Sequence, residues 1–307
     1  MKILVTGGAG FIGSNITDAY IALGHKVAII DNLSSGKRPN INPKARFCQM
    51  DINSDRVGGI FAKEKFDVVN HHAAQIDVRK SVTDPAFDAK VNIMGSLNLF
   101  ENAKKYGVKK IIFSSSGGTI YGECGQKAPD ELSKANPLSP YGIAKYSVEF
   151  YLKYYHSVHG LKYTILRYGN VYGPRQDPHG EAGVIAIFSG KMLDGETVNI
   201  FGDGKQMRDY VYVADVVKAN VLAIKKGDNE IINIGTGKAT SVNRVVKEMS
   251  KIISLEEEPV CKPAGSGELF KSFLKIEKAR RILKWKPEVP LCDGLKKTIE
   301  YFKKVRS

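Results

Sequence analysis

Short runs of β-branched residues alternate with helix-length amphipathic stretches through the first 170 residues of the chain. The strand-like runs are residues 2–6, 26–31, 46–50, 67–71, 110–114 and 163–167. The amphipathic stretches between them include residues 11–23, 87–106 and 141–159. Few folds accommodate this rhythm. It predicts an α/β fold with a doubly wound parallel sheet, covered by helices on both faces and joined by right-handed crossovers.

The turn after the first strand reads VTGGAGFIGSN and carries three glycines with the spacing Gly-x-x-Gly-x-x-Gly. Glycines at such a place permit a tight turn, a close approach of backbone amides to a pyrophosphate and close packing of helix on strand. The helix N-terminus that follows favours an anion. The sequence therefore predicts a Rossmann-like dinucleotide site whose turn consists of Gly7, Gly10, Phe11, Ile12 and Gly13.

The second strand ends at Asp31, where a carboxylate can accept hydrogen bonds from both ribose hydroxyls of an adenosine. A carboxylate there would repel a 2'-phosphate, so we expect the cofactor to be NAD and not NADP. Lys37 and Arg38 keep NADP as an alternative, because a nearby cation could pair with the phosphate. Asp51 and Ile52 are expected at the adenine edge, although Asp51 could instead cap the following helix.

The rhythm changes after Arg167. Residues 168–183 are rich in glycine, proline and polar side chains and are too long for a simple connection, which favours a functional loop. We expect a dinucleotide-binding domain at residues 1–168 and a smaller mixed α/β substrate domain at residues 169–307, with residues 209–236 returning to the first domain.

Candidate catalytic residues follow the fifth strand. Ser114 and Ser116 lie at its carboxyl end, where doubly wound folds bind their ligands. The stretch SPYGIAK then begins a helix: Ser139 suits the cap position, and Tyr141 and Lys145 fall one turn apart on one face.

A solvated surface pair would explain Tyr141 and Lys145 equally well if they stood alone. A tyrosine has a reference pKa near 10, and its use as a base at neutral pH requires stabilisation of the phenolate. A lysine ammonium and the positive nicotinamide of NAD would both stabilise the phenolate. Lowering the tyrosine pKa by ~3 units requires about 4 kcal/mol of such stabilisation. We therefore expect Tyr141 to remove a proton from a sugar hydroxyl that Ser116 holds, while Lys145 also holds the nicotinamide ribose.

Composition narrows the remaining choices. The chain of 307 residues has no apolar run of the roughly 18 residues that a membrane span needs, and no leader-like N-terminus, so we expect a cytoplasmic protein without membrane contact. Four scattered cysteines predict neither a disulfide framework nor a metal site. The formal net charge of +14 is spread along the chain and does not favour nucleic-acid binding.

Together these motifs resemble the extended short-chain dehydrogenase/reductase superfamily, and within it the UDP-glucose 4-epimerases and their relatives. The resemblance covers nearly the whole chain. It rests on residues 7–13, 31–36, 72–75, 92–96, 114–116, 141–145, 167–175 and 208–210.

The resemblance implies a tightly held NAD that takes hydride from C4 of a UDP-hexose and returns it to the other face of a 4-keto intermediate. It also implies that the UDP-sugar is held by Ser116, Asn170, Arg208 and Ser272. The residues it implies for NAD, besides the glycine turn and the catalytic pair, are Asp31, Asn32, Ser35, Gly36, Asp51, Ile52, Ala73, Ala74, Gln75, Asn92, Ser114 and Tyr168.

Three departures from the family pattern bear on these expectations. Gly117 and Gly118 add a residue relative to many epimerases, which leaves Ser115 and Thr119 as alternatives to Ser116, but no acid stands where the related dehydratases carry an Asp-Glu pair. Near residue 270 the family usually has an aspartate, an arginine and a helix-capping aspartate. This chain has Glu268, Phe270 and Lys275 there, with Lys262 or Lys271 as substitutes for the missing phosphate contact.

The small Ser272 falls near the position of a bulky tyrosine in epimerases restricted to UDP-glucose and UDP-galactose. A small residue there would leave room for a 2-acetamido group, so the resemblance implies UDP-N-acetylglucosamine as a second substrate. Two other readings stay open: an epimerase of another nucleotide sugar such as a UDP-uronic acid, and a non-catalytic NAD-binding regulatory protein. The family commonly dimerises through the helices expected at residues 87–106 and 141–159. The second of these is rich in aromatic residues, so we expect a homodimer.

Overall fold

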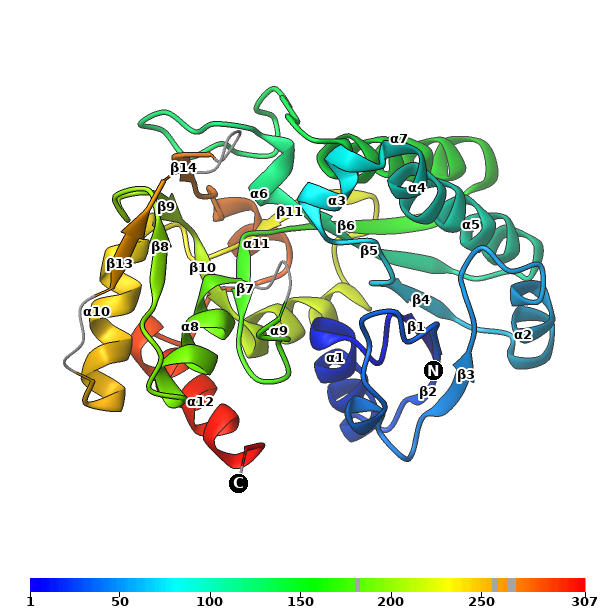
Figure 1. Ribbon diagram of the computed structural model, residues 1–307. Coiled ribbons are helices and arrows are strands. Elements are labelled where there is room, and N and C mark those ends of the chain that lie inside the picture. The colour runs from blue at the N-terminus through cyan, green and yellow to red at the C-terminus, as the bar shows by residue number, and fades with distance from the viewer. Residues whose placement is uncertain (180–182, 256–258, 264–268, 307) are drawn as a thin grey trace.

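The computed structural model describes residues 1–179, 183–255, 259–263 and 269–306. A seven-stranded parallel sheet with helices on both faces forms the larger part of the molecule (Figure 1). A smaller group of helices and short strands lies beyond one end of the sheet and has its own apolar core, which includes Phe188, Tyr212 and Met249. The α/β, doubly wound architecture expected from the sequence is confirmed.

The strand order in the large sheet is β11-β6-β5-β4-β1-β2-β3, and every neighbouring pair is parallel. The order reverses between β1 and β4, so the connections leave these two strands in opposite directions and a crevice opens at their carboxyl ends. The strands are β1 (Lys2–Thr6), β2 (Lys26–Asp31), β3 (Arg46–Gln49), β4 (Val68–His71), β5 (Lys110–Ser116), β6 (Lys162–Tyr168) and β11 (Glu230–Ile234).

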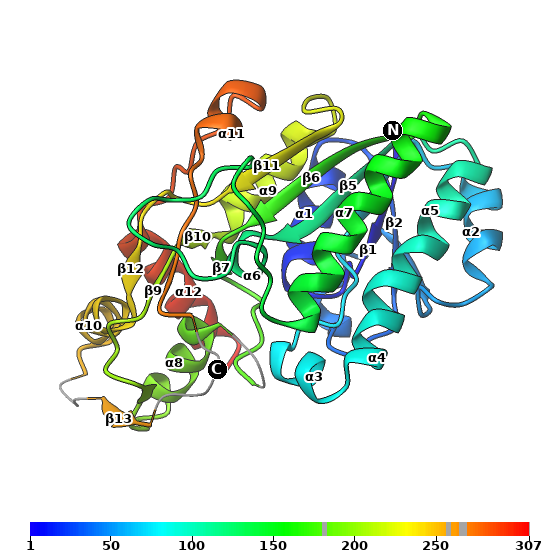
Figure 2. The ribbon, with the colours of Figure 1, turned by 90° about the horizontal axis from the view of Figure 1, so that it is seen from above.

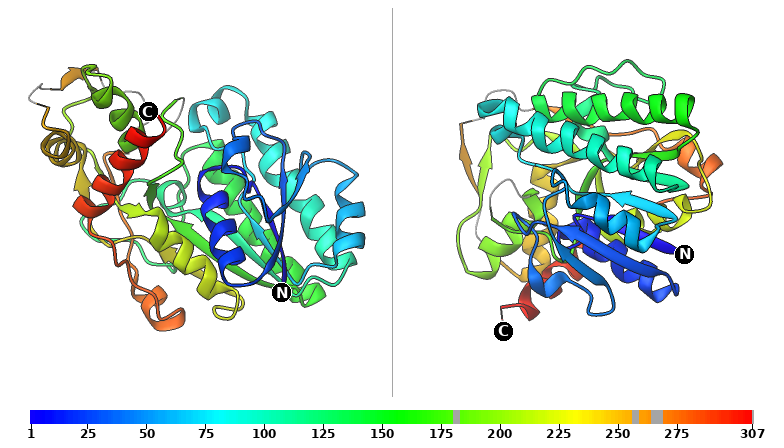
Figure 3. Two further views of the ribbon diagram at one scale, coloured as in Figure 1. Left: turned by 90° about the horizontal axis from the view of Figure 1, so that it is seen from below. Right: turned by 90° about the vertical axis from the view of Figure 1, so that its right-hand side faces the viewer.

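Each face of the sheet has its own helices and its own apolar cluster (Figures 2 and 3). Helices α1 (Phe11–Ala22) and α9 (Val213–Ala223) pack on one face, through residues such as Ile16 and Val216. The other face is covered by α2 (Val57–Glu64), α5 (Gly95–Lys105) and α7 (Pro140–His159). Burial on both faces explains why the central strands read as continuous apolar runs.

The helix expected over residues 87–106 is instead three segments. Helix α4 (Pro85–Ala89) starts where Asp84 accepts a hydrogen bond from the Phe87 backbone amide. A π-helical turn (Lys90–Met94) follows and leads into α5. The π-turn carries Asn92, and insertions of this type often mark functional sites. Just before α4 lies the short α3 (Val78–Thr83).

The part of the chain beyond β6 is built from short elements. Strand β7 (Asn170–Tyr172) pairs with β10 (Tyr210–Tyr212), and β9 (Met207–Arg208) pairs with both β12 and β14. The remaining elements are α6 (Gly117–Ile120), α8 (Val184–Leu193), β8 (Asn199–Phe201), β12 (Thr240–Ser241), α10 (Val242–Ile253), β13 (Val260–Lys262), β14 (Lys271–Ser272), α11 (Glu277–Ile282), α12 (Leu291–Lys304) and a 3₁₀ turn at Arg38–Asn40.

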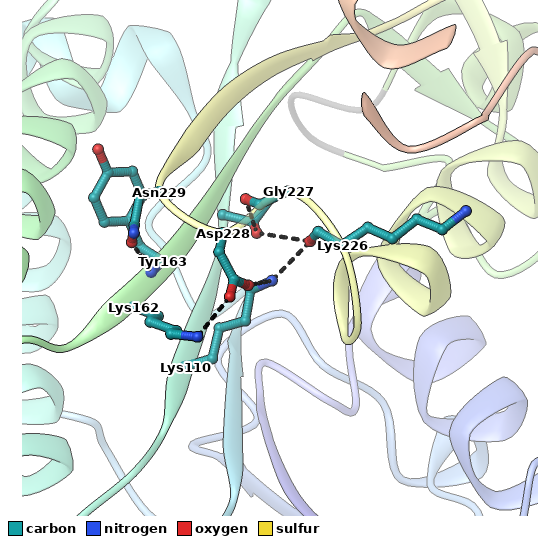
Figure 4. A network of polar contacts seen from close by, with 8 residues as sticks. Lys110, Lys162, Tyr163, Lys226, Gly227, Asp228 and Asn229 are labelled. Atoms are coloured by element: carbon teal, nitrogen blue, oxygen red, sulfur yellow. Dashed lines mark hydrogen bonds and ion pairs between the residues drawn. The ribbon is translucent and has the colours of Figure 1, made fainter. Parts of the chain in front are cut away.

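At the amino end of the sheet, two lysines link neighbouring strands to the loop before β11 (Figure 4). Lys110 Nζ donates to the Lys226 carbonyl and to Asp228 Oδ1, each at 2.7 Å. Lys162 Nζ contacts the other carboxylate oxygen of Asp228 at 2.8 Å. Burial lowers the pKa of Lys110, and Asp228 opposes that shift. These contacts tie β5 and β6 to the loop that precedes β11, at the end of the sheet away from the crevice.

No helix among the residues described has the length and apolarity that crossing a bilayer would require.

Candidate active site

A cleft of about 210 Å³ lies over the carboxyl ends of β1 and β4. Its walls bring together the glycine turn, Asp31, Tyr141, Lys145 and Tyr168. A cleft at the switch point of a doubly wound sheet is the usual ligand site of this architecture.

The glycine turn leaves no space for side chains at two of its positions. Gly7 has φ +69°, and a Cβ there would lie 2.7 Å from the Ala73 backbone nitrogen. A Cβ on Gly13 would lie 2.2 Å from the Gly7 carbonyl oxygen. Helix α1 begins after Gly10, which caps it without a side-chain hydrogen bond. Gly10 and the first residues of the helix line the cleft. This cradle fits the pyrophosphate of a dinucleotide.

Asp31 is 7% exposed and is fixed by backbone donors. Its Oδ2 accepts from the Ala9 amide at 2.9 Å and its Oδ1 from the Leu33 amide at 2.8 Å. A Cβ on Gly36 would lie 2.8 Å from Asp31 Oδ1, so glycine is needed there. The carboxylate thus lines the cleft, where it would repel a 2'-phosphate.

The two cations that could pair with such a phosphate have other partners. Lys37 Nζ forms an ion pair with Asp177 at 3.3 Å. Arg38 Nη2 donates to Gln49 Oε1 at 2.7 Å. These contacts favour NAD over NADP.

Asp51 does not cap α2, whose cap residue is Arg56. Instead Asp51 Oδ2 accepts from Asn32 Nδ2 at 2.9 Å, and Oδ1 accepts from the Asn53 amide at 2.8 Å. Asp51 and Asn32 both line the cleft, and this hydrogen bond joins the loops that follow β2 and β3.

Helix α7 carries Tyr141 and Lys145 into the cleft. Ser139 caps the helix by accepting from the Gly142 amide, and Pro140 occupies its first turn, as the sequence predicts. Lys145 is 4% exposed, and its Nζ donates to the Ser114 carbonyl oxygen at 2.9 Å. The same ammonium lies 5.9 Å from the centroid of the Tyr141 ring. Tyr141 and Lys145 therefore line the cleft together and are not a solvated surface pair.

Burial governs the proton equilibria of this pair. It lowers the pKa of Lys145 to about 8, and the negative charge of Asp88 opposes that shift. Burial raises the pKa of the Tyr141 phenol, and Asp88 raises it further. The sequence predicts a lowered tyrosine pKa from the lysine ammonium together with the positive nicotinamide of NAD, and within the polypeptide burial and the Asp88 charge act against that lowering.

The three serines at the end of β5 differ in their partners. Ser114 Oγ donates to the His71 carbonyl at 3.0 Å, and Ser115 Oγ donates to Glu149 Oε1 at 2.6 Å. Within the described part of the chain, Ser116 Oγ makes no hydrogen bond, and it is half-buried. Thr119 Oγ1 also lacks a partner but is fully buried. Of these four hydroxyls, Ser116 Oγ is the one that has no hydrogen-bond partner among the described residues and is not fully buried.

The residues expected to hold the sugar nucleotide form two pairs, Ser116 with Asn170 and Arg208 with Ser272. A Cβ on Gly118 would lie 3.8 Å from both Ser116 Oγ and Asn170 Oδ1, so these two side chains border one space. Arg208 pairs in register with Ser272, which is 3% exposed. Phe270 is 56% exposed. Glu268 lies outside the described residues.

Most of the residues expected to bind the cofactor line this cleft. Gln75, Asn92 and Gly36 do not, and neither do the four residues expected to bind substrate. Gln75 and Asn92 lie behind the wall: the Gln75 amide donates to Asn92 Oδ1 at 2.9 Å, and Asn92 Nδ2 donates to the Gln75 carbonyl at 3.0 Å. The expected residues in the lining are Gly7, Gly10, Phe11, Ile12, Gly13, Asp31, Asn32, Ser35, Asp51, Ile52, Ala73, Ala74, Ser114, Tyr141, Lys145 and Tyr168.

Sequence reasoning missed several lining residues, and His72 is the one among them with a titratable side chain. Its Nε2 contacts the Tyr168 hydroxyl at 3.1 Å, and the two rings stack with centroids 6.0 Å apart. The signal was available, because His72 directly follows β4 and precedes Ala73. The other missed lining residues are Ser34, Met50, Ile76 and Val91, while Ser115, an alternative to Ser116 as the catalytic hydroxyl, also lines the cleft.

Comparisons with known proteins agree with this geometry. The model of the NAD dependent epimerase/dehydratase family matches residues 3–235. A curated protein of Methanocaldococcus jannaschii described as a putative UDP-glucose 4-epimerase is 48% identical over 301 residues, which are 98% of each chain.

Two solved structures are similar over almost the whole chain. The UDP-glucose 4-epimerase of Thermotoga maritima, solved with UDP-glucose, has a TM-score of 0.98 and 55% identity over 100% of both chains. A UDP-N-acetylglucosamine 4-epimerase of Methanobrevibacter ruminantium, solved with UDP-N-acetylmuramic acid, has a TM-score of 0.94 and 37% identity, and covers 99% of this chain and 98% of its own.

Proposed function

The chain belongs to the NAD dependent epimerase/dehydratase family and is an NAD-dependent epimerase of UDP-sugars, and we propose that its substrates are UDP-glucose and UDP-galactose. Bound NAD supplies a positively charged ring that accepts and returns a hydride. The polypeptide supplies the cradle for the pyrophosphate, through the turn from Gly7 to Gly13, and the ribose acceptor Asp31.

Tyr141 is the acid and base in this proposal. Its phenolate takes the proton of the sugar C4 hydroxyl as the hydride leaves C4, and the resulting phenol later returns that proton to the same oxygen. The observation that carries the proposal is the sharing of one cleft by Tyr141, Lys145 and the dinucleotide turn. Because burial raises the tyrosine pKa, positive charge at the site must offset desolvation before Tyr141 can accept a proton.

Lys145 and Ser116 have separate tasks. Lys145 stays fixed on the Ser114 carbonyl, and its ammonium orients the nicotinamide ribose and stabilises the tyrosinate. Ser116 holds the C4 hydroxyl, a role supported by its half-buried Oγ, which has no hydrogen-bond partner among the residues that the structure describes. The other two serine hydroxyls already have protein acceptors.

Asn170, Arg208 and Ser272 are proposed to contact the UDP-sugar. A guanidinium suits a pyrophosphate because it presents several donors in a planar fork. Ser272 stands beside Arg208 in the register of β14 and β9, and its small side chain is consistent with room for a 2-acetamido group. We therefore propose UDP-N-acetylglucosamine and UDP-N-acetylgalactosamine as a second substrate pair.

Separate incubations with UDP-galactose, UDP-N-acetylgalactosamine and UDP-glucuronic acid, without added NAD, test the proposal by chromatography of the products. Conversion of UDP-galactose supports epimerisation with a retained cofactor, and conversion of the acetylated sugar supports the role of Ser272. Conversion of the glucuronic acid alone would replace the proposed substrate by a uronic acid. No conversion of any sugar by protein that demonstrably holds NAD would reject the proposal and favour a regulatory role.

A further inference from the structure

Asp88 is a buried carboxylate between the wall of the cofactor cleft and the helix that carries Tyr141. It lies on α4, which packs against α7, and it is 1% exposed. Its Oδ1 accepts from Gln75 Nε2 and from Asn92 Nδ2, both at 2.9 Å. One oxygen of Asp88 thus joins the loop after β4 to the π-helical turn.

The second oxygen of Asp88 is different. Oδ2 is buried and has no hydrogen-bond partner within the described part of the chain. A buried carboxylate without an ion-pair partner is costly, and burial raises the pKa of Asp88. The hydrogen bonds from Asn92 and Gln75 and the positive charge of Lys145 act in the opposite direction and favour the ionised carboxylate. Both groups that respond to the Asp88 charge most directly are on α7: it raises the pKa of Tyr141 and counteracts the fall in the pKa of Lys145.

Other titratable groups lie on the elements around Lys145. Glu149, one turn further along α7, pairs with Arg167 of β6 at 2.5 Å. His71 and His72 at the end of β4 have pKa values lowered by burial and so carry no charge at neutral pH. From β5, Lys145 meets the Ser114 carbonyl and the face of the Phe113 ring, 4.9 Å away, neither of which titrates.

We propose that Asp88 is a positioning residue of the reaction: one carboxylate oxygen fixes Gln75 and Asn92 behind the cofactor cleft, and its negative charge sets the electrostatic potential at Tyr141 and Lys145. The inference rests on the proposed function, since the roles of Tyr141 and Lys145 come from it. Asp88 touches neither the sugar nor the reacting atoms, and it acts through the pair on α7.

Asp88→Asn tests this inference. An asparagine can keep both hydrogen bonds that Oδ1 accepts while it removes the charge. Loss of a negative charge disfavours the lysine ammonium and favours the tyrosine phenolate, so both pKa values fall. We expect both limbs of the pH profile of kcat/KM to move about one pH unit toward acid. Asp88→Glu, which restores the charge, should return the limbs toward their wild-type positions.

The matched control is Asp215→Asn. Asp215 is also a buried carboxylate that accepts backbone hydrogen bonds, from Glu288 and Val289, but it lies on α9, away from the catalytic pair. Its pH limbs should match those of the wild type. Should Asp88→Asn fail to fold, Asp88→Ser removes the same charge with a smaller side chain and carries the same expectation.

The outcomes separate the inference from the proposed function. Wild-type protein that converts no UDP-sugar at any pH overturns the proposed function, and the inference with it. Active wild type with an Asp88→Asn variant that is slower at every pH but has unmoved limbs overturns the inference alone, because Asp88 would then be only a structural residue. A parallel acid shift of both limbs supports it.

Discussion

Glu149 and Arg167 form a buried ion pair that joins the catalytic helix α7 to strand β6. The Arg167 Nη2 and Glu149 Oε2 atoms are 2.5 Å apart, and the two side chains are 4% and 1% exposed. Glu149 Oε1 also accepts from Arg167 Nε and from Ser115 Oγ, and Arg167 Nη1 donates to the Tyr121 hydroxyl. The pair therefore fixes the distance between α7 and the carboxyl end of β5.

Glu149→Leu should destabilise the protein by about 3–5 kcal/mol, because it leaves the Arg167 guanidinium buried without a counter-charge. The double variant Glu149→Leu/Arg167→Met should recover much of that loss, since both charges are then gone. Urea unfolding followed by circular dichroism measures both. A single variant within about 1 kcal/mol of the wild type would contradict the importance of the pair.

Tyr141→Phe should reduce kcat by about 10²–10⁴-fold, the usual effect of removing a general acid and base, while NAD stays bound. Steady-state assays and the nucleotide content of the purified protein measure the two quantities. Tyr151→Phe, which changes an exposed tyrosine of the same helix, is the matched control. Undiminished turnover would remove Tyr141 from the mechanism.

Asp31→Ser should weaken NAD binding by about 10–100-fold, as expected for the loss of one charged hydrogen-bond acceptor, and should narrow the preference for NAD over NADP. Adding Asp177→Asn should narrow it further, because Lys37 loses its partner. Calorimetric titration with both nucleotides measures the preference. Asp177→Asn alone should keep the wild-type NAD affinity, and an unchanged preference in the double variant would speak against the role of Asp31.

His71 makes the protein less stable in acid. Burial is the main reason that the pKa of this histidine lies well below its ordinary value, with contributions from Lys145 and His72. Below pH ~6.5 the unfolded chain binds a proton that the folded chain excludes. For this group, the free energy of unfolding therefore decreases by about 1.4 kcal/mol for each unit by which the pH is lowered.

His71→Gln should reduce the slope of unfolding free energy against pH between about pH 6.5 and 5 by that amount. Urea unfolding at several pH values, at saturating NAD, measures the slope. The exposed His179→Gln is the matched control. A slope in His71→Gln identical to that of the wild type would contradict the assignment.

An aromatic surface on α7 is expected to form a homodimer interface. Phe150, Tyr151 and Tyr154 are 53%, 39% and 49% exposed, next to one another on the helix. Phe150→Glu should shift the protein from dimer to monomer in light scattering at micromolar concentration, because a charge at this apolar surface would be buried on association. Leu23→Glu, at an exposed leucine of a different surface, is the control. A monomeric wild type would refute the prediction.

Features encoded in short stretches of sequence were predictable. The glycine turn at residues 7–13, the Ser139 cap and the Pro140 helix start each follow from local backbone preferences, and the structure has them where the sequence indicates. The alternation of strands and helices likewise determined the parallel sheet, since burial on both faces leaves a readable apolar pattern.

The partners of polar side chains were decided only by the tertiary structure. Three consecutive serines read alike in sequence, yet Ser114 and Ser115 have acceptors on β4 and α7, and Ser116 has none among the described residues. Asp88 gave no sequence signal, because Gln75, one of its two hydrogen-bond partners, is 13 positions away, and Tyr141, whose pKa it raises, is 53 positions away. Periodicity encodes which face of an element is buried, but hydrogen bonds and pKa shifts depend on atoms that the fold brings together from distant segments.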